Sequence, residues 1–233
     1  MPTAISPFWL IRNRFATFKL VTPVRAAHGT IEHVLIEYRA EGGDPFIEYE
    51  TWIAADGAWC RRTVEGVPGR RVADTRLTLC RSSAGVVEVY LPAGNEILRT
   101  RPGAASGAET GGTPVGTAEK GWLTDDVVEQ FRRDAVREEG TMTLDGHEYA
   151  RLVTADGHDT VLVDPRTGEA VAWIPSPAAF GVPTTVVKTR RTLPDDAPSR
   201  RSLSLTELHP DAVVRDVTAA ERERAIARQY PRG

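Results

Sequence analysis

Two histidine–carboxylate pairs are the residues whose types and spacing most resemble a metal-binding or proton-transfer site. His147-Glu148 and His158-Asp159 each follow an Asp-Gly pair, so two imidazoles and two carboxylates could meet at one end of a sheet. Such a group could bind a metal ion or transfer protons, but a metal site needs three or four converging ligands. The alternative is that all four are polar residues beside turns. We adopt this alternative, and predict no catalytic residue and no metal site.

Sequence motifs of catalysis and cofactor binding point the same way. The chain has no Gly-x-Ser-x-Gly nucleophile elbow, no His-Glu-x-x-His zinc motif, no phosphate-binding Gly-Lys-Ser/Thr loop and no dinucleotide fingerprint after a strand. We therefore expect a protein that is not an enzyme and needs no cofactor.

Composition limits the classes of partner. The formal net charge of −3 comes from 29 basic and 32 acidic residues, so no net basic field attracts a nucleic-acid backbone. No run approaches the roughly 18 apolar residues that span a bilayer, and residues 8–11 are too short for a signal-peptide core. We expect no nucleic acid, no transmembrane segment and no signal peptide in the chain as given.

The two cysteines, Cys60 and Cys80, lie in β-like runs on either side of a turn at residues 66–71. They lack the spacing of metal ligands and are too few for a disulfide framework. One interpretation is a disulfide between neighbouring strands. The other, which we prefer from the sequence, is two separate, half-buried thiols.

Hairpins are the elements that must position any site. In residues 160–175, TVLVDPRTGEAVAWIP, two β-rich runs flank a turn that contains Pro and Gly, and residues 85–100 repeat the arrangement. Asp-Gly pairs at 56–57, 145–146 and 156–157 add further turns. Short links predict antiparallel neighbours, and the alternation at residues 201–208 predicts a late strand. We expect an α+β protein with a mainly antiparallel half-barrel of about 11 strands.

One helix is expected within this sheet. Thr124 can cap it, and Leu123, Val127, Phe131 and Ala135 recur every fourth residue. We predict that this central helix, residues 124–138, packs on the concave face of the sheet. Residues 102–121, rich in Gly, Ala, Thr and Pro, are expected to form a flexible loop.

The remaining segments flank a single predicted domain at residues 25–217. Residues 1–24 are expected to be helical, either docked on the sheet or lying on a membrane surface as an amphipathic or signal-anchor segment. Residues 218–233 are expected to form a C-terminal helix that starts with a capping box, Thr218 to Glu221.

Aromatic and aliphatic side chains in the strands and the central helix suggest an apolar cavity. Those on the concave face could line it, and an ordinary core filled by the same side chains is the alternative. The candidate ligand-binding residues are Tyr49, Trp52, Trp59, Val87, Tyr90, Val127, Phe131, Val163 and Trp173.

Arginine pairs accompany several of these strands. The simplest interpretation is that they keep sheet edges solvated and discourage edge-to-edge pairing. A second is that some form a basic rim for an acidic head group or an anionic partner. The pairs are Arg61-Arg62, Arg70-Arg71, Arg190-Arg191 and Arg200-Arg201.

Three stretches resemble a known family. EYETWIAADGAWCR at residues 48–61, GVVEVYLPAGNEILR at 85–99 and VLVDPRTGEAV at 161–171 are similar to strand and turn motifs of the LolA, LolB and RseB superfamily. This superfamily of bacterial lipoprotein carriers and periplasmic sensors includes mycobacterial lipid-binding lipoproteins. The likeness covers roughly residues 30–214, and the richness in Arg, Ala, Gly and Pro resembles that of actinobacterial proteins.

The resemblance implies a half-barrel with a helical lid over an apolar cavity for acyl chains. It also implies a location in the cell envelope or outside the cytoplasm. The first functional hypothesis is therefore a non-enzymatic, carrier-like protein that binds an acyl chain or another apolar ligand. The alternative is a sensory or regulatory module of the RseB type that binds an envelope or regulatory protein and no lipid.

Overall fold

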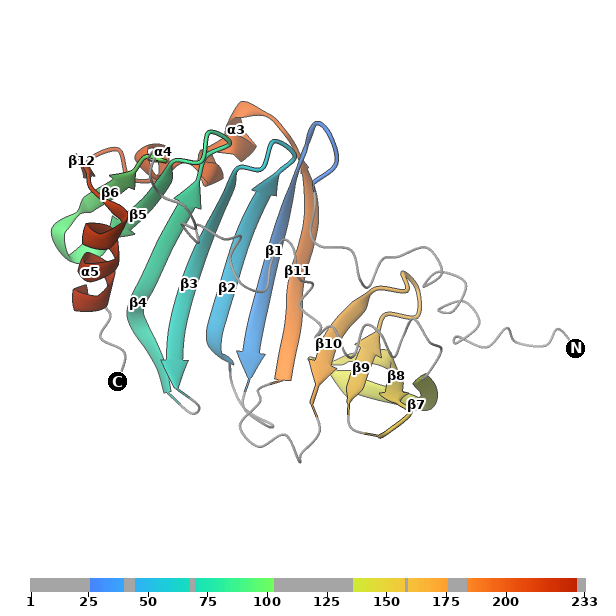
Figure 1. The fold of residues 1–233 in the computed structure, drawn as a ribbon. Helices are drawn as coiled ribbons and strands as arrows, with labels where there is room; N and C mark the ends of the chain where they lie inside the picture. Colours follow the sequence, from blue (N-terminus) through green and yellow to red (C-terminus); the bar gives the residue numbers. More distant parts are fainter. Residues whose placement is uncertain are drawn as a thin grey trace, which may run out of the picture.

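A single open sheet dominates the computed structural model, which describes residues 26–39, 45–67, 70–102, 136–157, 159–175 and 184–229 (Figure 1). The sheet has 12 strands in the order β12-β6-β5-β4-β3-β2-β1-β11-β10-β9-β8-β7. Its neighbours pair antiparallel, apart from the parallel pair β12 and β6. The predicted fold class, an antiparallel half-barrel, is confirmed.

The strands and helices have the following bounds. The first half contains β1 (Thr30–Arg39), β2 (Pro45–Ala54), β3 (Trp59–Val67), β4 (Arg70–Arg81), β5 (Val87–Leu91), the 3-10 turn η1 (Pro92–Gly94) and β6 (Glu96–Thr100). The second half contains β7 (Val136–Leu144), β8 (His147–Thr154), β9 (Thr160–Val163), β10 (Ala170–Ile174) and β11 (Thr184–Pro194). The C-terminal part contains α3 (Ala197–Arg200), η2 (Arg201–Leu203), α4 (Leu205–Leu208), β12 (Val213–Asp216) and α5 (Ala219–Gln229).

Both predicted hairpins form. In the β9–β10 turn, the Asp164 carboxylate accepts from Arg166 N at 2.7 Å and the Thr167 hydroxyl accepts from Glu169 N at 3.2 Å. These two side chains therefore stabilise the turn. The β7–β8 turn takes the type I′ form that favours Asp-Gly, because Asp145 and Gly146 have positive φ angles of 50° and 79°.

Pairing of β1 with β11 joins the two halves of the chain. It runs from Thr30 opposite Pro194 to Arg39 opposite Thr184. An ionic contact supports this junction: Arg39 donates to both oxygens of the Asp145 carboxylate at 2.9 Å, and Lys188 also binds Asp145. The guanidinium and the ammonium hold the pKa of Asp145 well below its usual range.

Alternation along the strands gives the sheet two faces. The register places Thr51, Arg61, Leu79 and Val89 in one row, and Trp59 lies on the same side two residues before Arg61. We call this side the Trp59 face. The opposite side, the Trp52 face, carries Trp52, Cys60, Cys80 and Glu88 in one row.

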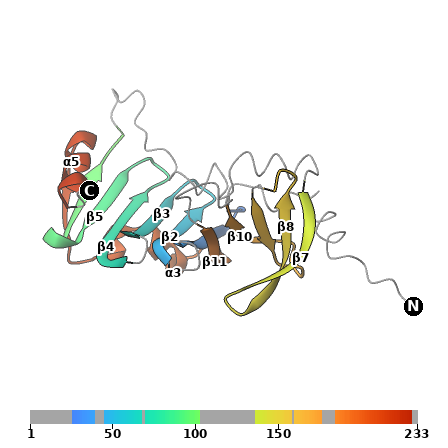
Figure 2. The ribbon, with the colours of Figure 1, turned by 90° about the horizontal axis from the view of Figure 1, so that it is seen from below.

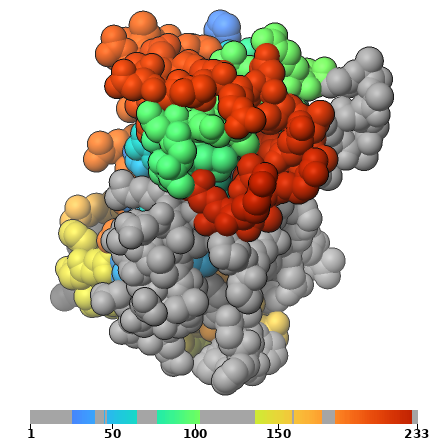
Figure 3. Space-filling model, turned by 90° about the vertical axis from the view of Figure 1, so that its left-hand side faces the viewer, coloured from blue at the N-terminus to red at the C-terminus, as the bar shows by residue number. Residues whose placement is uncertain are grey.

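Helices cover different parts of the two faces (Figure 2). On the Trp52 face, Leu205 of α4 is fully buried against Cys60, Cys80 and Ile97. On the Trp59 face, Ala225 and Ile226 of α5 pack at the β5–β6 end of the sheet. Figure 3 shows the red C-terminal segment lying against the green residues of this end. Each of the two faces therefore carries an apolar core of its own.

The prediction of a strand at residues 201–208 is wrong. These residues form η2 and α4, because local caps favour helical turns over the extended chain. The Ser204 hydroxyl accepts from Glu207 N at 3.4 Å, and the Asp196 carboxylate accepts from Ser199 N at 2.9 Å. Ser204 in this Ser–Leu alternation is therefore the N-cap of α4, and Leu205, which follows it, is buried.

The C-terminal end of the predicted central helix is also wrong. Residues 136–138 belong to β7, where Val136 lies opposite Thr154. Strand pairing overrides the local helical pattern here, and the register shifts between Glu138 and Thr141 around Gly140, whose φ is 80°. Residues 124–135 and the predicted segment 1–24 lie outside the described residues.

The preferred interpretation of the cysteines is wrong as well. Cys60 and Cys80 form a disulfide, with Cα atoms 4.0 Å apart, because the β3–β4 register places them directly opposite each other. Both side chains are buried. The bond joins two neighbouring strands beneath Leu205.

At the C-terminus the predicted capping box is present. Thr218 N donates to the Glu221 carboxylate at 2.8 Å, and Glu221 N donates to the Thr218 hydroxyl at 3.3 Å. Among the helices that the structure describes, none has the length and apolar content to span a bilayer.

Candidate functional site

The structure divides the predicted cavity residues between the two faces. Those on the Trp59 face are Tyr49, Trp59, Val87, Val163 and Trp173. Those on the Trp52 face are Trp52 and Tyr90. Val127 and Phe131 lie outside the described residues. Sequence reasoning treated these residues as one lining, whereas the register separates Trp52 and Tyr90 from the rest.

An apolar cluster occupies the middle of the Trp59 face. Its buried members are Val34, Ile36, Ile53 and Trp59, from β1, β2 and β3. Partly buried side chains that pack against it are Tyr38, Leu79 and Val187. Of the helices within the described part of the chain, α5 is the one that packs on this face, at the β5–β6 end. The buried members form a core, and the partly buried Tyr38, Leu79 and Val187 are the side chains of this cluster that an apolar ligand could contact.

Aromatic side chains extend this cluster toward the end of β1. The rings of Tyr38 and Tyr49 meet edge to face, with centroids 5.4 Å apart, and the Arg61 guanidinium lies 4.9 Å from the Tyr49 centroid. Burial, and then the neighbouring Tyr49, raise the pKa of Tyr38. Tyr38 is therefore a neutral side chain at the edge of the cluster.

Two polar atoms are buried within this same face. Trp59 Nε1 and Thr51 Oγ1 have no hydrogen-bond partner, although Trp59 and Thr51 are only 4% and 1% exposed. Thr51 lies opposite Arg61 in the β2–β3 pair, and Trp59 precedes Arg61 by two residues on the same face. Trp59 and Thr51 are therefore diagonal neighbours on this face of the β2–β3 pair.

Farther along the Trp59 face, where α5 packs, three more polar atoms are buried without a partner. Thr100 Oγ1 at the end of β6 is buried without a partner, as are Nε and Nη1 of Arg222 in α5. Arg222 Nη2 donates to Glu223 at 3.1 Å. The apolar cluster of Val34 and Trp59 does not include these residues.

Trp52 and Tyr90 are occupied by stacking on the opposite face. His33 stacks on Trp52 with centroids 4.8 Å apart, and the Arg62 guanidinium lies 5.0 Å from the Trp52 ring. His209, just after α4, stacks on Tyr90 at 3.6 Å. Burial, and then Arg62, lower the pKa of His209, which favours the neutral imidazole. Trp52 belongs to a buried apolar cluster with Ile31, and Tyr90 packs against the cluster that contains Ile97. Both therefore contribute to the core of the Trp52 face, on the opposite side of the sheet from Trp59.

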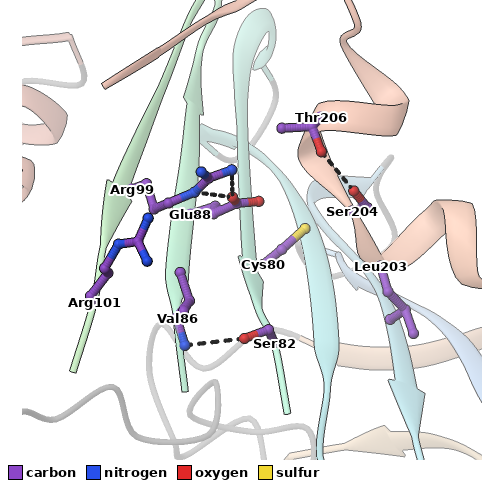
Figure 4. Close-up of a pocket in the computed structure, with 9 residues that line it drawn as sticks. All are labelled: Cys80, Ser82, Val86, Glu88, Arg99, Arg101, Leu203, Ser204 and Thr206. Atoms are coloured by element: carbon purple, nitrogen blue, oxygen red, sulfur yellow. Dashed lines mark hydrogen bonds and ion pairs between the residues drawn. The ribbon is translucent and has the colours of Figure 1, made fainter. Parts of the chain in front are cut away.

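A pocket of about 340 Å³ lies on the Trp52 face beneath η2 and α4 (Figure 4). It is lined by Cys80, Ser82, Val86, Glu88, Arg99, Arg101, Leu203, Ser204 and Thr206. Several of its polar groups bind one another. Arg99 Nε donates to Glu88 at 2.8 Å, and the hydroxyls of Ser204 and Thr206 lie 3.0 Å apart.

These internal pairs reduce what the pocket can offer a ligand. Ser82 Oγ already accepts from Val86 N at 3.2 Å, and Arg101 Nη2 lies 3.6 Å from Asp216. A ligand would have to replace these interactions, so it would gain little net hydrogen-bond energy. The Trp59 face, with unpaired donors, is the better candidate. Sequence reasoning did not predict the pocket, because α4 was expected to be a strand.

The histidine–carboxylate pairs singled out as a possible metal-binding or proton-transfer site lie as follows. His147 starts β8 and its ring lies 6.5 Å from that of Tyr149. His158 lies outside the described residues, and Asp159 accepts a hydrogen bond from Trp173 Nε1 at 2.9 Å. No group of three or more His, Cys, Asp or Glu side chains suited to a metal ion occurs within the described ranges.

Sequence reasoning missed Thr51 and Arg61 as members of the site. The alternation of Tyr49, Thr51 and Ile53 would have placed Thr51 beside the aromatic residues, and counting on from Trp59 would have placed Arg61 on the same side. The sequence signal for both residues was the alternation of side chains along a strand, which places every second residue on the same face.

Comparisons with known proteins give fold likeness at low identity. No family model matches the chain, and no curated protein matches it significantly. An uncharacterized conserved protein from Thermus thermophilus is 10% identical, with 81% of this chain and 91% of that chain covered and a TM-score of 0.38.

Two other solved structures are similar to this chain. The Pseudomonas aeruginosa MucA/MucB complex is 14% identical over 76% of this chain and 56% of that chain, with a TM-score of 0.39. A LolA superfamily protein from Nitrosomonas europaea is 9% identical over 86% of this chain and 99% of that chain, with a TM-score of 0.31. The latter bears the name of the superfamily that the sequence resembles.

Proposed function

We propose that the protein is a binding protein of the carrier type that holds an acyl chain or a similar apolar ligand on the Trp59 face. The observation that supports this proposal is the buried cluster of Val34, Ile36, Ile53 and Trp59. In the proposal, Val127 and Phe131, which lie outside the described residues, also belong to the ligand-binding residues. Tyr49, Val87, Val163 and Trp173 share the face, and the partly buried Tyr49 and Trp173 would extend the surface available to a long chain.

The hydrophobic effect can drive such binding without chemistry. Burying an acyl chain of about 15 methylenes contributes on the order of 10 kcal/mol, at about 0.8 kcal/mol for each methylene. The loss of translational and rotational freedom offsets several kcal/mol of this. With a cost of about 4 kcal/mol, about 6 kcal/mol remains, which corresponds to a dissociation constant of tens of micromolar.

Native mass spectrometry of the purified protein, followed by titration with a fluorescent fatty acid, tests the proposal. We expect saturable binding with one dominant stoichiometry. Finding neither a co-purified ligand nor saturable binding would reject it.

A matched pair of variants locates the ligand. Leu79 packs against the Trp59 cluster and Leu35 lies on the opposite face, and both side chains are partly buried. We expect Leu79→Gln to weaken binding about tenfold, equivalent to about 1.4 kcal/mol. Leu35→Gln should leave it within about twofold. Equal effects of the two substitutions would move the ligand away from the Trp59 face.

The edge strand β12 favours a second candidate function, a protein-interaction module. Val213 and Val214 are 59% and 40% exposed, on a strand whose other neighbour in the sheet is absent among the described residues. An exposed apolar edge can pair with an extended segment of a partner protein. Recovery of one stoichiometric partner by the wild-type protein, and its loss with Val213→Lys, would favour this function over ligand binding.

A further inference from the structure

The unpaired hydrogen-bond donors of the Trp59 face indicate which polar group the ligand carries, beyond the apolar chain that the cluster favours. A buried indole N–H usually has a hydrogen-bond partner, and a buried hydroxyl without one also costs free energy. Trp59 Nε1 and Thr51 Oγ1 are both buried without a partner, next to an apolar cluster. A ligand that carried only methylenes would leave both groups unpaired.

Their positions suit a single acceptor. The β2–β3 register makes Thr51 and Trp59 diagonal neighbours on one face. Val34 lies beside Thr51 in the β1–β2 pair, and Ile53 lies opposite Trp59. An oxygen held by the two donors would thus be attached to a chain that leaves directly across aliphatic side chains.

The positive charge of Arg61, close to the two donors, also favours an oxygen acceptor. Arg61 lies opposite Thr51, and its guanidinium rests over the Tyr49 ring. A positive side chain at the edge of an apolar surface favours an oxygen that is negative or strongly polar. A second indole on the same face behaves differently, because Trp173 Nε1 already donates to Asp159 at 2.9 Å.

We infer that the ligand is an amphipathic acyl compound whose carbonyl or carboxylate oxygen accepts hydrogen bonds from Trp59 Nε1 and the Thr51 hydroxyl. This inference rests on the proposed function and specifies its ligand. The acyl oxygen is common to free fatty acids and to acyl esters. A plain hydrocarbon of the same length lacks it.

The test compares lauric acid, methyl laurate and dodecane as competitors of a fluorescent alkyl probe on the full chain. We expect the acid and the ester to bind at least about tenfold more tightly than dodecane, because dodecane leaves both donors unpaired. Tighter binding of the acid than of the ester would support a charge contribution from Arg61. Equal binding of the two would support recognition of the neutral carbonyl.

Variants assign the preference to the two donors. Trp59→Phe keeps an aromatic ring without the N–H, and Thr51→Val replaces the hydroxyl with a methyl group. Each should reduce the preference for oxygen-bearing ligands over dodecane at least about threefold, whatever it does to dodecane binding itself, and a cooperative urea transition of each variant reports that it is folded. Trp52→Phe, which changes an indole on the opposite face, is the control, and its preference should equal that of the wild type.

Three results would overturn the inference. The first is equal binding of all three compounds by the wild type, which leaves apolar ligand binding intact. The second is an unchanged preference in both Trp59→Phe and Thr51→Val. The third is no binding of any compound, which removes the proposed function together with the inference.

Discussion

Removing the Cys60–Cys80 disulfide should destabilise the sheet by an amount that follows from the loop it closes. The two cysteines are separated by 20 residues. In the chain-entropy model, a loop of this length restricts the unfolded state by about 3 kcal/mol. Both side chains are buried against Leu205 and Ile97, so a double Cys60→Ala, Cys80→Ala variant also loses a smaller packing contribution.

Urea unfolding of the oxidised protein, the reduced protein and the double variant measures this effect. With an m-value of about 3 kcal/mol per molar urea, the midpoint should fall by about 1 M on reduction, with m nearly constant. The reduced protein and the double variant should behave similarly.

Alkylation of unfolded, unreduced protein provides the control for the bond itself. Mass spectrometry should find no alkylated cysteine before reduction and two after it. Labelling of both thiols without reduction, or identical midpoints in the two redox states, would refute the reasoning.

Two further predictions concern the contacts that join the parts of the fold. Asp145→Asn should lower the free energy of unfolding by about 1 kcal/mol, a discounted value because the Asp145 carboxylate is 38% exposed. Because the pKa of Asp145 is lowered in the folded state, its contribution is complete above the unfolded pKa of about 4 and is lost at lower pH. Urea midpoints of wild type and variant should therefore converge on acidification, and a constant gap would contradict this assignment. Leu205→Ala should cost about 3 kcal/mol because Leu205 is fully buried, whereas Leu208→Ala, at a partly buried position, should cost less than half as much.

Local signals in the sequence predicted the hairpins well. Asp-Gly pairs and the Pro–Gly turn at 164–168 fix backbone conformations within a few residues, so their positions follow from residue type alone. The capping box at Thr218 and Glu221 is similarly local. The β1–β11 pairing could not be predicted in this way, because it joins strands far apart in the chain.

The disulfide illustrates why register is hard to predict. Near the β3–β4 turn, Val67 lies opposite Arg70, and continuing that register would place Cys60 opposite Leu77. An irregularity between Val64 and Gly66 shifts the pairing and brings Cys80 opposite Cys60 instead. Residue types alone do not reveal such a shift.

The candidate site was partly predictable for a related reason. Strand parity correctly assigns Tyr49, Thr51 and Ile53 to one face. Parity would also have excluded Trp52, which lies between them on the other side. The unpaired state of Trp59 Nε1 depends on the three-dimensional surroundings of the indole, so only a structure could reveal it.

Photo-crosslinking with a diazirine-labelled fatty acid tests ligand binding on the Trp59 face most directly. After digestion, mass spectrometry should locate the label on side chains of that face, such as Tyr38, Leu79 and Val187. Excess unlabelled fatty acid should abolish the labelling. Label concentrated on Leu203 and the other residues of the Trp52-face pocket, or labelling that does not saturate, would contradict the proposed site.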